Sequence, residues 1–412
     1  MRAMANWHHA VAHIDADSFY ASCEAVRHPE LKGRPICVLS NQNAFVVAKS
    51  YDAKALGIKT VMSVHDAKKL APHAAYLPPD FQFYGQISAK MFSILRRYSP
   101  QIEVYSIDEC FMDMNGIRTL WRKSYRQIAD DIRESVKREI GITVSVGIAN
   151  TKTLAKIASE SNKPNGTSIV PGKHIGRFLA GIPIRDIPGI GHSRAALLCK
   201  FDIRTAQDFA NTKESLVKRL LGRLGLTLWH ELNGQPVLPL EVKPPLPKSV
   251  ARTASMGEIT TDRTTITAHL SRHTLRLVSE LVAKKLLARR LRIFLTCKSF
   301  EAASIEIHMD FPTNSLKKVS AAVKQAFLTL YREGEVYRGC GVIATHISRQ
   351  ESATEDLFGL MHEDVRQQRL MLTVNDINQQ HGNHTVAPAA ARLMQKPQAR
   401  PARFQYPVFM AR

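Results

Sequence analysis

The amino-acid sequence predicts an α+β protein with several domains, and three observations support this prediction. At 412 residues the chain is too long for one compact core, and domain-size scaling suggests roughly two to four units. Strand-like and helix-like segments alternate through about the first 165 residues. A proline-rich run at 235–247, QPVLPLEVKPPLP, precedes a later βαββαβ pattern.

Alternating and buried apolar patterns define the elements of the first part. Strands are expected at 11–16, 36–39, 45–48, 102–106, 110–114 and 143–148. Helical spacing predicts helices over 18–26, 51–56, 87–98 and 124–140. Asp17 is well placed as the N-cap of the first helix, and Gly57 stops the second. Ser99-Pro100 ends the third helix, and Asn115-Gly116 provides the turn after the fifth strand.

The second part begins with a helical, short-looped stretch from about residue 166 to 234. The five prolines of 235–247 favour extended backbone, so the run could bridge up to about 40 Å as a stiff strap. Beyond it, strands are expected at 249–255, 291–297, 304–311 and 339–346, with helices over 264–288 and 316–332. The remainder from residue 349 is polar, with one further helix expected over 363–379.

Composition and charge limit the class of protein. Hydrophobic residues make up 44% of the chain and charged residues 23%, as in ordinary globular proteins. Lys and Arg total 57 against 36 Asp and Glu, and the formal charge of +21 indicates nucleic acid or another anionic partner. No apolar stretch approaches a membrane span and no signal-peptide core is seen, so no membrane association is expected. Six cysteines without CxxC spacing argue against zinc or disulfides and favour a cytoplasmic location.

Three carboxylates lie where predicted strands end or meet. Asp15 ends the first strand, and Asp108-Glu109 separates two apolar strands, where unpaired burial would be costly. Magnesium prefers such hard oxygen ligands, and two-metal phosphoryl transfer needs ions roughly 3.5–4 Å apart. Taken alone, Asp108-Glu109 is more often a solvated loop pair. Asp17 and Asp113 are rival acids, for which capping and turn roles are sufficient.

Four motifs around these acids resemble, in order and spacing, those of the Y-family translesion DNA polymerases. They are HIDADSFYASCE, VVAKSYDAKALGIK, YSIDECFMDMNG and VGIANTKTLAKIASESNKPNG, within a resemblance that runs from residue 13 to 348 and more loosely into the tail. Within the family, ASCE, AKALG and the tail length look most like UmuC, the catalytic subunit of the DNA polymerase V type. The resemblance implies low-fidelity, DNA-directed DNA synthesis in translesion repair and the SOS response.

The resemblance also implies a right-hand-like architecture with palm, fingers, helical thumb and a βαββαβ little finger. It divides the chain into a palm at 1–23 and 78–165, fingers at 24–77, a thumb with a helix-hairpin-helix at 166–234, a linker at 235–247, a little finger at 248–348 and a tail at 349–412.

Matching positions imply which residues form the catalytic site. Asp15, Asp108 and Glu109 match the family's carboxylates for two Mg²⁺ ions, and the backbone carbonyl of Ala16 matches its main-chain ligand. Phe19-Tyr20 matches the pair beside the nucleotide sugar, with Tyr20 as the steric gate that rejects a ribose hydroxyl. Core packing is the alternative for Phe19.

Further matches imply contacts to the nucleotide phosphates. Tyr51 and Lys54 match contacts to the incoming triphosphate, and Lys163 matches a phosphate-binding lysine. Lys54 keeps the charge of the commoner Arg but loses its bidentate fork. Ala48 lacks the hydroxyl that many relatives carry. Lys152 and Lys156 share a helix face, for which a solvated stripe is the alternative.

The DNA and clamp contacts depend on weaker motifs. Gly189 and Gly191 resemble the thumb's helix-hairpin-helix, whose backbone approaches a DNA phosphate, although an ordinary helix–helix turn has the same pattern. Basic residues of the βαββαβ segment, including Lys248 and Arg252, are expected to line the duplex. Leu357-Phe358 resembles a sliding-clamp peptide, and residues 405–409 are a second candidate.

The implied substrates are primer–template DNA and deoxynucleoside triphosphates. The implied partners are a sliding clamp and, as further candidates, UmuD-like subunits and a recombinase filament. Two alternatives stay open: a palm-fold nucleotide cyclase and a non-catalytic damaged-DNA-binding subunit. The first leaves the basic final domain without a purpose, and the intact carboxylates argue against the second.

Overall fold

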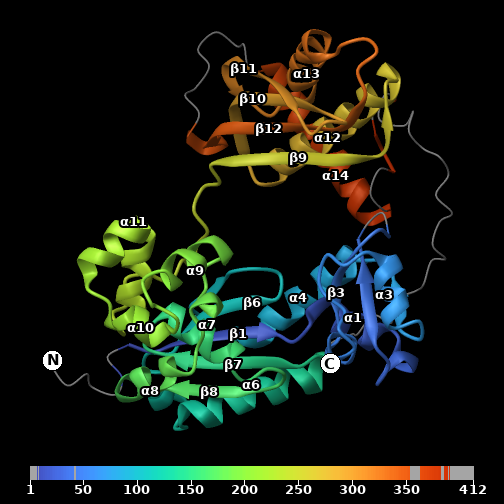
Figure 1. Ribbon diagram of the computed structural model, residues 1–412. Helices are drawn as coiled ribbons and strands as arrows, with labels where there is room; N and C mark the ends of the chain where they lie inside the picture. The colour runs from blue at the N-terminus through green and yellow to red at the C-terminus, as the bar shows by residue number, and fades with distance from the viewer. Residues whose placement is uncertain are drawn as a thin grey trace. The chain divides into compact units, whose positions relative to one another are not determined.

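The computed structural model describes residues 7, 9–40, 43–352, 362–381, 385–387 and 389. The chain divides into two compact units, Met1–Pro244 and Pro245–Arg412, which are coloured from blue to yellow-green and from yellow to red in Figure 1. The division falls inside the proline-rich run that the sequence predicts to separate domains.

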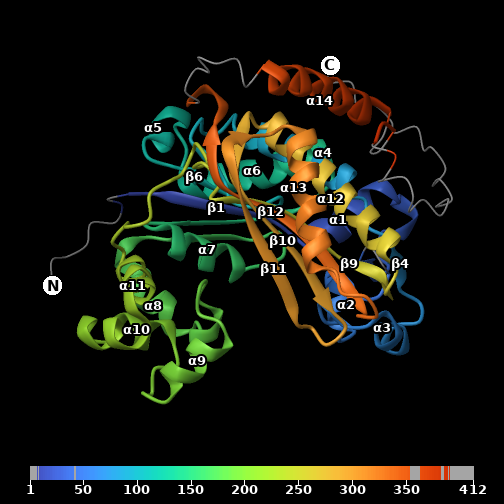
Figure 2. The same ribbon diagram turned by 90° about the horizontal axis from the view of Figure 1, so that it is seen from above.

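A five-stranded sheet forms the centre of the first unit. Its order is β5 (Ile102–Val104), β6 (Glu109–Asp113), β1 (Val11–Ala16), β7 (Val144–Ala149) and β8 (Thr167–Val170). All neighbours are antiparallel except β7 and β8. Ala12 and Ile14 join the apolar core with α4 (Phe81–Leu95) and α6 (Tyr125–Ile140), while α7 (Lys152–Glu160) covers the other face (Figures 1 and 2).

Capping explains where α6 begins and ends, and it corrects the prediction for the first helix. Ser124 and Gln127 form a capping box at the start of α6, and Gly141 ends it with φ 86°. By contrast, α1 (Phe19–Arg27) has Ser18 as its N-cap, without a side-chain cap. The predicted N-cap role of Asp17 is therefore wrong, because its buried carboxylate accepts hydrogen bonds from two other segments. The helix predicted over 87–98 also begins earlier, at Phe81.

Two smaller assemblies complete the first unit. A three-stranded sheet with its own core has the order β3 (Val46–Lys49), β2 (Ile36–Leu39) and β4 (Ala75–Leu77), and carries α2 (Tyr51–Ala55) and α3 (Val64–Leu70). The stretch predicted to be helical from about residue 166 begins instead with β8, because residues 167–170 pair with β7. The predicted helices come after it: α8 (Ile175–Ala180), α9 (His192–Cys199), α10 (Ala206–Asn211) and α11 (Glu214–Leu232). Their core is shared with α7. A short helix, α5 (Ile117–Trp121), lies between β6 and α6.

Two buried carboxylates hold the first half of the proline-rich run against the first unit. Glu231, at the end of α11, accepts the backbone N–H groups of Val237 and Leu238 at 2.9 and 3.0 Å. Glu103 on β5 accepts the backbone N–H of Glu241 at 2.9 Å. The run is therefore not an extended strap throughout, because residues 237–241 are fastened to the first unit.

The second unit has the βαββαβ order that the sequence predicts. Its elements are β9 (Ser249–Thr260), α12 (Arg263–Ala283), β10 (Leu286–Cys297), β11 (Ala302–Thr313), α13 (Leu316–Leu330) and β12 (Tyr337–Arg349). The antiparallel sheet has the order β11-β10-β12-β9, and α14 (His362–His381) packs on α12 and α13. The helix predicted over 264–288 ends at Ala283, because Leu286–Ala288 pairs with the end of β12.

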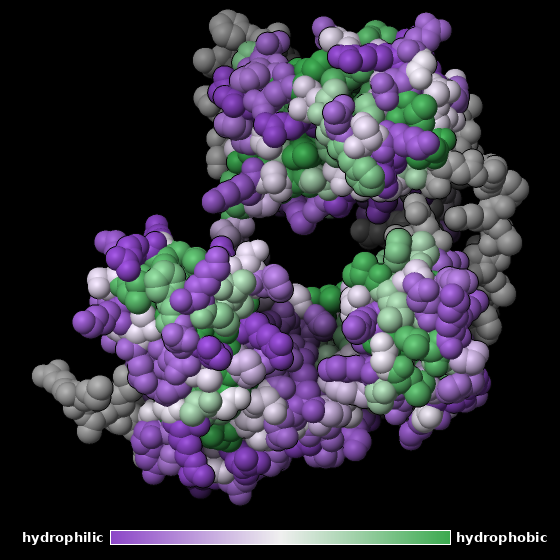
Figure 3. All heavy atoms as spheres, in the orientation of Figure 1, coloured by the Kyte–Doolittle hydropathy of each residue, from purple (hydrophilic) through white to green (hydrophobic). Residues whose placement is uncertain are grey.

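Hydrophilic residues cover most of the face of each unit that Figure 3 shows, as expected for a chain with 57 Lys and Arg. Within the described residues, no helix combines the length and apolar character needed to cross a bilayer.

Gly147 is expected to be essential for the packing of α7 on the sheet. A Cβ at Gly147 would overlap the carbonyl oxygen of Ala155 and the amide of Ser159. We expect Gly147→Ala to destabilise the first unit by about 3 kcal/mol, because backbone must shift. Urea unfolding followed by tryptophan fluorescence measures this, since the three tryptophans, Trp7, Trp121 and Trp229, lie in the first unit.

Gly85→Ala is the matched control for this prediction. Gly85 lies in α4, and a Cβ there would meet nothing within 4 Å. Alanine should therefore stabilise the helix by about 0.5–1 kcal/mol. Equal effects of the two substitutions would contradict the packing role assigned to Gly147.

Candidate active site

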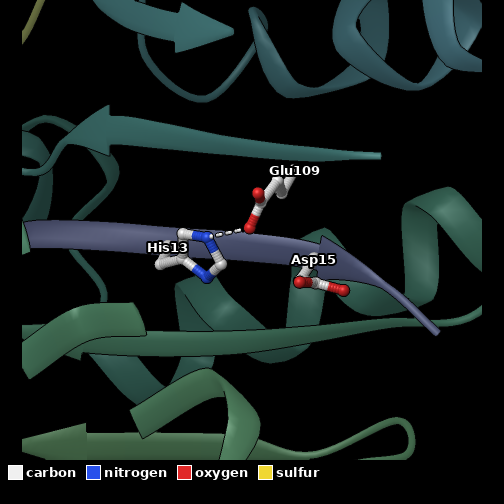
Figure 4. A group of neighbouring side chains, drawn as sticks. All are labelled: His13, Asp15 and Glu109. Carbon is white, nitrogen blue, oxygen red and sulfur yellow. Dashed lines mark hydrogen bonds and ion pairs between the residues drawn. The ribbon is translucent and has the colours of Figure 1, made fainter. Parts of the chain in front are cut away.

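The site is built where β1 and β6 run side by side. Asp15 lies opposite Glu109 of β6 and opposite Ser145 of β7 in the sheet register. His13, Asp15 and Glu109 each offer a ligand atom, and these atoms all lie within 4.8 Å of one another. Figure 4 shows the three side chains along β1, with Glu109 directed toward the imidazole of His13.

Asp15 is 7% exposed and is paired with a lysine. The Nζ of Lys163 donates to its Oδ1 at 2.6 Å, and the same Nζ also contacts Glu160 at 2.7 Å. Burial raises the pKa of Asp15 to about 7, while the charge and hydrogen bond of Lys163 oppose the shift and the charge of Asp108 adds to it. A positive ion beside this carboxylate would therefore stabilise its charged form.

Glu109 is held by two donors that reach the same oxygen. Its Oε2 accepts from Nε2 of His13 at 2.9 Å and from Nζ of Lys156 on α7. Burial alone would raise the pKa of Glu109, but these hydrogen bonds and charges lower it to about 2. The carboxylate is therefore ionised at neutral pH. Burial also lowers the pKa of His13, which favours the neutral imidazole.

Asp108 lies in the turn before β6, beside the pair but outside their cluster. The hydroxyl of Ser106 donates to its Oδ1, and its backbone carbonyl accepts from the N–H of Ala16 at 2.9 Å. This backbone bond joins the turn to the end of β1. The structure thus brings two of the three predicted carboxylates together, with Asp108 and Ala16 adjacent.

The residues present fit a divalent cation with a preference for oxygen ligands. Asp15 and Glu109 each commit one oxygen to a lysine, and no hydrogen bond to the other oxygen is found among the described residues. Both nitrogens of His13 are engaged, at Glu109 and at Ser159. The atoms available to bind a metal are therefore carboxylate oxygens, the ligands that Mg²⁺ prefers.

Aromatic side chains lie next to the acids. Tyr20 stacks on Tyr84 with ring centroids 4.6 Å apart and an interplanar angle of 18°, and Phe81 meets its edge. Burial and the charge of Asp108 raise the pKa of Tyr20. Phe19 is 3% exposed and belongs to the core, in agreement with the structural alternative for that residue.

Two of the predicted phosphate contacts, Tyr51 and Lys54, lie on α2. Burial raises the pKa of Tyr51 to about 12, and the charges of Asp17, Lys163 and Asp15 also act on its hydroxyl. The Nζ of Lys54 lies 5.9 Å from the Tyr51 ring centroid. Lys163 and Tyr51 therefore lie close enough to Asp15 to interact with its charge, and Lys54 lies beside Tyr51.

The predicted DNA contacts are placed separately. Gly189 has φ 90° and accepts from Arg194 at 2.7 Å, and Gly191 is the N-cap of α9. Lys248 is exposed just before β9. Arg252 is ion-paired with Glu280 of α12 and lies on the helix-covered side of the sheet, which does not favour a DNA contact. The clamp candidates Leu357-Phe358 and 405–409 lie outside the described residues.

Two residues of the site, His13 and Ser159, are not predicted from the sequence, and Lys156 is predicted only as one of two residues on a helix face. His13 and Ser159 are buried, and Lys156 contacts the carboxylate directly. The solvated-stripe alternative for Lys152 and Lys156 is wrong, because Lys152 is 8% exposed and pairs with the buried Glu103. A histidine two residues before Asp15 on a strand does share its face, which is a usable signal.

Comparisons with known proteins agree with this geometry. The model of the impB/mucB/samB family matches residues 14–160, and the model of its C-terminal domain matches residues 247–357. DNA polymerase IV of Bacillus velezensis is 32% identical over 388 residues, covering 92% of each chain. DNA polymerase IV of Desulfatibacillum aliphaticivorans is 31% identical over 387 residues, covering 92% of this chain and 96% of the relative.

Solved structures are similar as well. A Y-family DNA polymerase chimera of Dbh and Dpo4 has a TM-score of 0.68 at 25% identity, over 82% of this chain and 99% of that one. An insertion ternary complex of Dbh DNA polymerase has a TM-score of 0.60 at 25% identity, with the same coverage.

Proposed function

This chain belongs to the impB/mucB/samB family of Y-family DNA polymerases and is a DNA-directed DNA polymerase, and we propose that it is of the DNA polymerase IV type. An enzyme of this type carries out translesion synthesis. It adds deoxynucleotides to a primer 3′ end on damaged templates, in the cytoplasm. The proposal is supported by two relatives, of Bacillus velezensis and Desulfatibacillum aliphaticivorans, which are both DNA polymerases IV. Its substrates are primer–template DNA and deoxynucleoside triphosphates.

The pairing of Asp15 with Glu109 on neighbouring strands carries this proposal. Two magnesium ions, when bound, would activate the primer hydroxyl and neutralise the phosphates. Asp15, Glu109 and the adjacent Asp108, with the backbone of Ala16, would hold them. Lys163 and Lys54 would neutralise phosphate oxygens of the incoming nucleotide, because their positive charge is opposite to that of the phosphates.

The proposed domain roles follow the chain order. The five-stranded sheet with α4, α6 and α7 is the palm, which thereby includes β8, a strand that the sequence-based division gives to the thumb. The three-stranded sheet with α2 and α3 is the fingers. The helices α8 to α11 form the thumb, in which Gly189 and Gly191 approach a DNA phosphate. The second unit is the little finger, and its exposed Lys248 is the more suitable of the two predicted contacts.

The UmuC assignment is the alternative within the family. It rests on the words ASCE and AKALG and on the tail. Both relatives described above, each matching over 92% of this chain, are DNA polymerases IV, which favours that type. A UmuC-like enzyme should need UmuD-like subunits and a recombinase filament, whereas the proposed type should extend primers alone or with a sliding clamp bound to the tail.

Magnesium-dependent extension of a labelled primer tests the function. Undamaged and abasic templates are used with sliding clamp present, and the Asp108→Ala/Glu109→Ala protein runs alongside. We expect the wild type to extend the primer on both templates and the double variant to extend it on neither. If the wild type fails even with clamp and UmuD-like subunits, salt-sensitive DNA binding alone would favour the damaged-DNA-binding subunit.

Tyr20 is expected to exclude ribonucleotides. Its ring is fixed by stacking on Tyr84, so a 2′-hydroxyl beside it would meet a rigid wall. We expect Tyr20→Ala to lower the ratio of kcat/KM for deoxynucleotides to that for ribonucleotides by about 100-fold, or roughly 2.7 kcal/mol. Single-nucleotide insertion with each sugar measures the ratio.

The control for the sugar test is Tyr20→Phe. This variant keeps the ring and removes only the hydroxyl, so the ratio should stay within about threefold of the wild-type value. A ratio that falls as far in Tyr20→Phe as in Tyr20→Ala would assign the selection to the hydroxyl instead of the ring.

A further inference from the structure

His13 lies at the centre of the site, yet the nucleotidyl-transfer chemistry assigns it no task. It is completely buried on β1, two residues before Asp15 and on the same face of the strand. Its ring packs against Phe111 with centroids 4.7 Å apart. Its proximity to Asp15 and Glu109 makes it a candidate metal ligand.

The hydrogen bonds of the ring exclude that ligand role. A carboxylate only accepts, so Nε2 must carry the hydrogen that it shares with Oε2 of Glu109 at 2.9 Å. Nδ1 lies 2.7 Å from the hydroxyl of Ser159, which can donate to it. If Ser159 donates instead to the carbonyl of Lys156, 2.8 Å away, then Nδ1 must donate to Ser159. In the first arrangement the ring is neutral and its one lone pair, on Nδ1, accepts the Ser159 hydroxyl; in the second the ring is doubly protonated and has no lone pair. In neither arrangement is a lone pair free for a metal.

The same bonds fix the carboxylate of Glu109. Its Oε2 receives His13 and Lys156 together, and Figure 4 shows the other oxygen turned away from the imidazole. A donor at a fixed position selects one rotamer of a side chain that otherwise has three rotatable bonds. Outer partners of this kind orient ligating groups and often change metal affinity by about 10–100-fold.

The packing of α7 makes this arrangement possible. Gly147 lies opposite His13 on β7, and its missing side chain leaves room for the backbone of Ser159 against the sheet. Ser159 is 1% exposed, so its hydroxyl has no competing bulk water. The ring is therefore held from both sides, by Glu109 and Phe111 of β6 and by Ser159 of α7.

We propose that His13, fixed by Ser159, is a positioning residue that sets the orientation of Glu109 for binding of the divalent cation. The inference rests on the proposed function, because it assumes that Glu109 ligates the metal. If this buried histidine had a purely structural role, its substitution would lower the stability of the protein and leave the metal affinity unchanged.

Two substitutions separate the nitrogens of the ring. Gln at position 13 can place its Nε2 where the imidazole Nε2 lies and keep the donor to Glu109. Asn is shorter and reaches only the Nδ1 position, so it retains the contact with Ser159 and loses the donor. His13→Gln is therefore the matched control for His13→Asn, and Ser159→Ala removes the outer hydrogen bond.

Manganese affinity is measured without turnover. The full chain is bound to a primer–template with a dideoxy-terminated primer and the next deoxynucleotide, and free Mn²⁺ is followed by electron paramagnetic resonance. We expect His13→Asn to weaken Mn²⁺ binding by about 10–100-fold and His13→Gln to stay within about threefold of wild type. Ser159→Ala should lie between them.

The inference is overturned if His13→Asn binds Mn²⁺ as the wild type does, or if His13→Gln is equally weak. Melting temperatures identify variants that fail to fold. If His13→Asn fails to fold, an unchanged Mn²⁺ affinity in Ser159→Ala overturns the proposal that Ser159 and His13 orient Glu109. Failure of the proposed function is distinguishable, because wild-type protein would then not extend primers at any Mg²⁺ concentration.

Discussion

Asp15→Asn is expected to lower kcat/KM for deoxynucleotide insertion by about 10³-fold, equal to roughly 4 kcal/mol. The amide keeps the size of the side chain but removes the charge that favours a bound cation. It also replaces one oxygen by an NH₂ group, which cannot ligate a metal. Single-turnover insertion across a range of Mg²⁺ concentrations measures the loss.

Asp17→Asn is the matched control, because Asp17 is also buried and only two residues away. Its oxygens accept the hydroxyl of Ser145 at 2.8 Å and the N–H of Asn165 at 2.7 Å, so they are already committed. We expect reduced stability and a kcat/KM within about tenfold of wild type. Wild-type insertion by Asp15→Asn at the same Mg²⁺ concentration would remove Asp15 from the proposed metal site.

The contrast between Asp15 and Asp17 shows what the sequence can predict. Strand periodicity identifies β1 and places Asp15 at its end, and the motif words single out Asp108-Glu109. Local rules then assign Asp17 to helix capping, which is wrong. Its actual donors, Ser145 and Asn165, are more than a hundred residues away in the chain, so no local pattern could have predicted them.

The same limit explains the residues around Glu109. His13 is visible as a strand residue on the Asp15 face, but its partner Ser159 is 146 positions away. Lys156 looks like part of a solvated stripe until α7 is packed on the sheet. The packing itself depends on Gly147, whose absent side chain leaves the space. The acids can thus be predicted from the sequence, whereas the residues that hold them in position are brought together only by tertiary packing.

The proline-rich run is a case where composition is right about the position and incomplete about the structure. Five prolines predict an extended segment between domains, and the boundary does fall within it. Composition does not reveal that Glu103 and Glu231 hold the backbone of residues 237–241.

Glu231→Ala is expected to destabilise the first unit by about 3–4 kcal/mol. The carboxylate is completely buried and accepts three backbone N–H groups, from Val237, Leu238 and, at 3.0 Å, Thr153 in the first turn of α7. Alanine would leave these donors without an acceptor and would remove a negative charge from a helix N-terminus. Urea unfolding followed by tryptophan fluorescence measures the change in free energy.

Two controls separate the carboxylate's role from a general effect of substitution. Glu231→Gln keeps one acceptor oxygen, so it should be less destabilising than alanine, by at least about 1 kcal/mol. Glu134→Ala removes an exposed acid from α6 and should change stability by less than about 0.5 kcal/mol. If Glu231→Ala also increased protease cleavage within residues 237–241, Glu231 would be the group that fastens this segment to the first unit. Unchanged cleavage together with wild-type stability would contradict that conclusion.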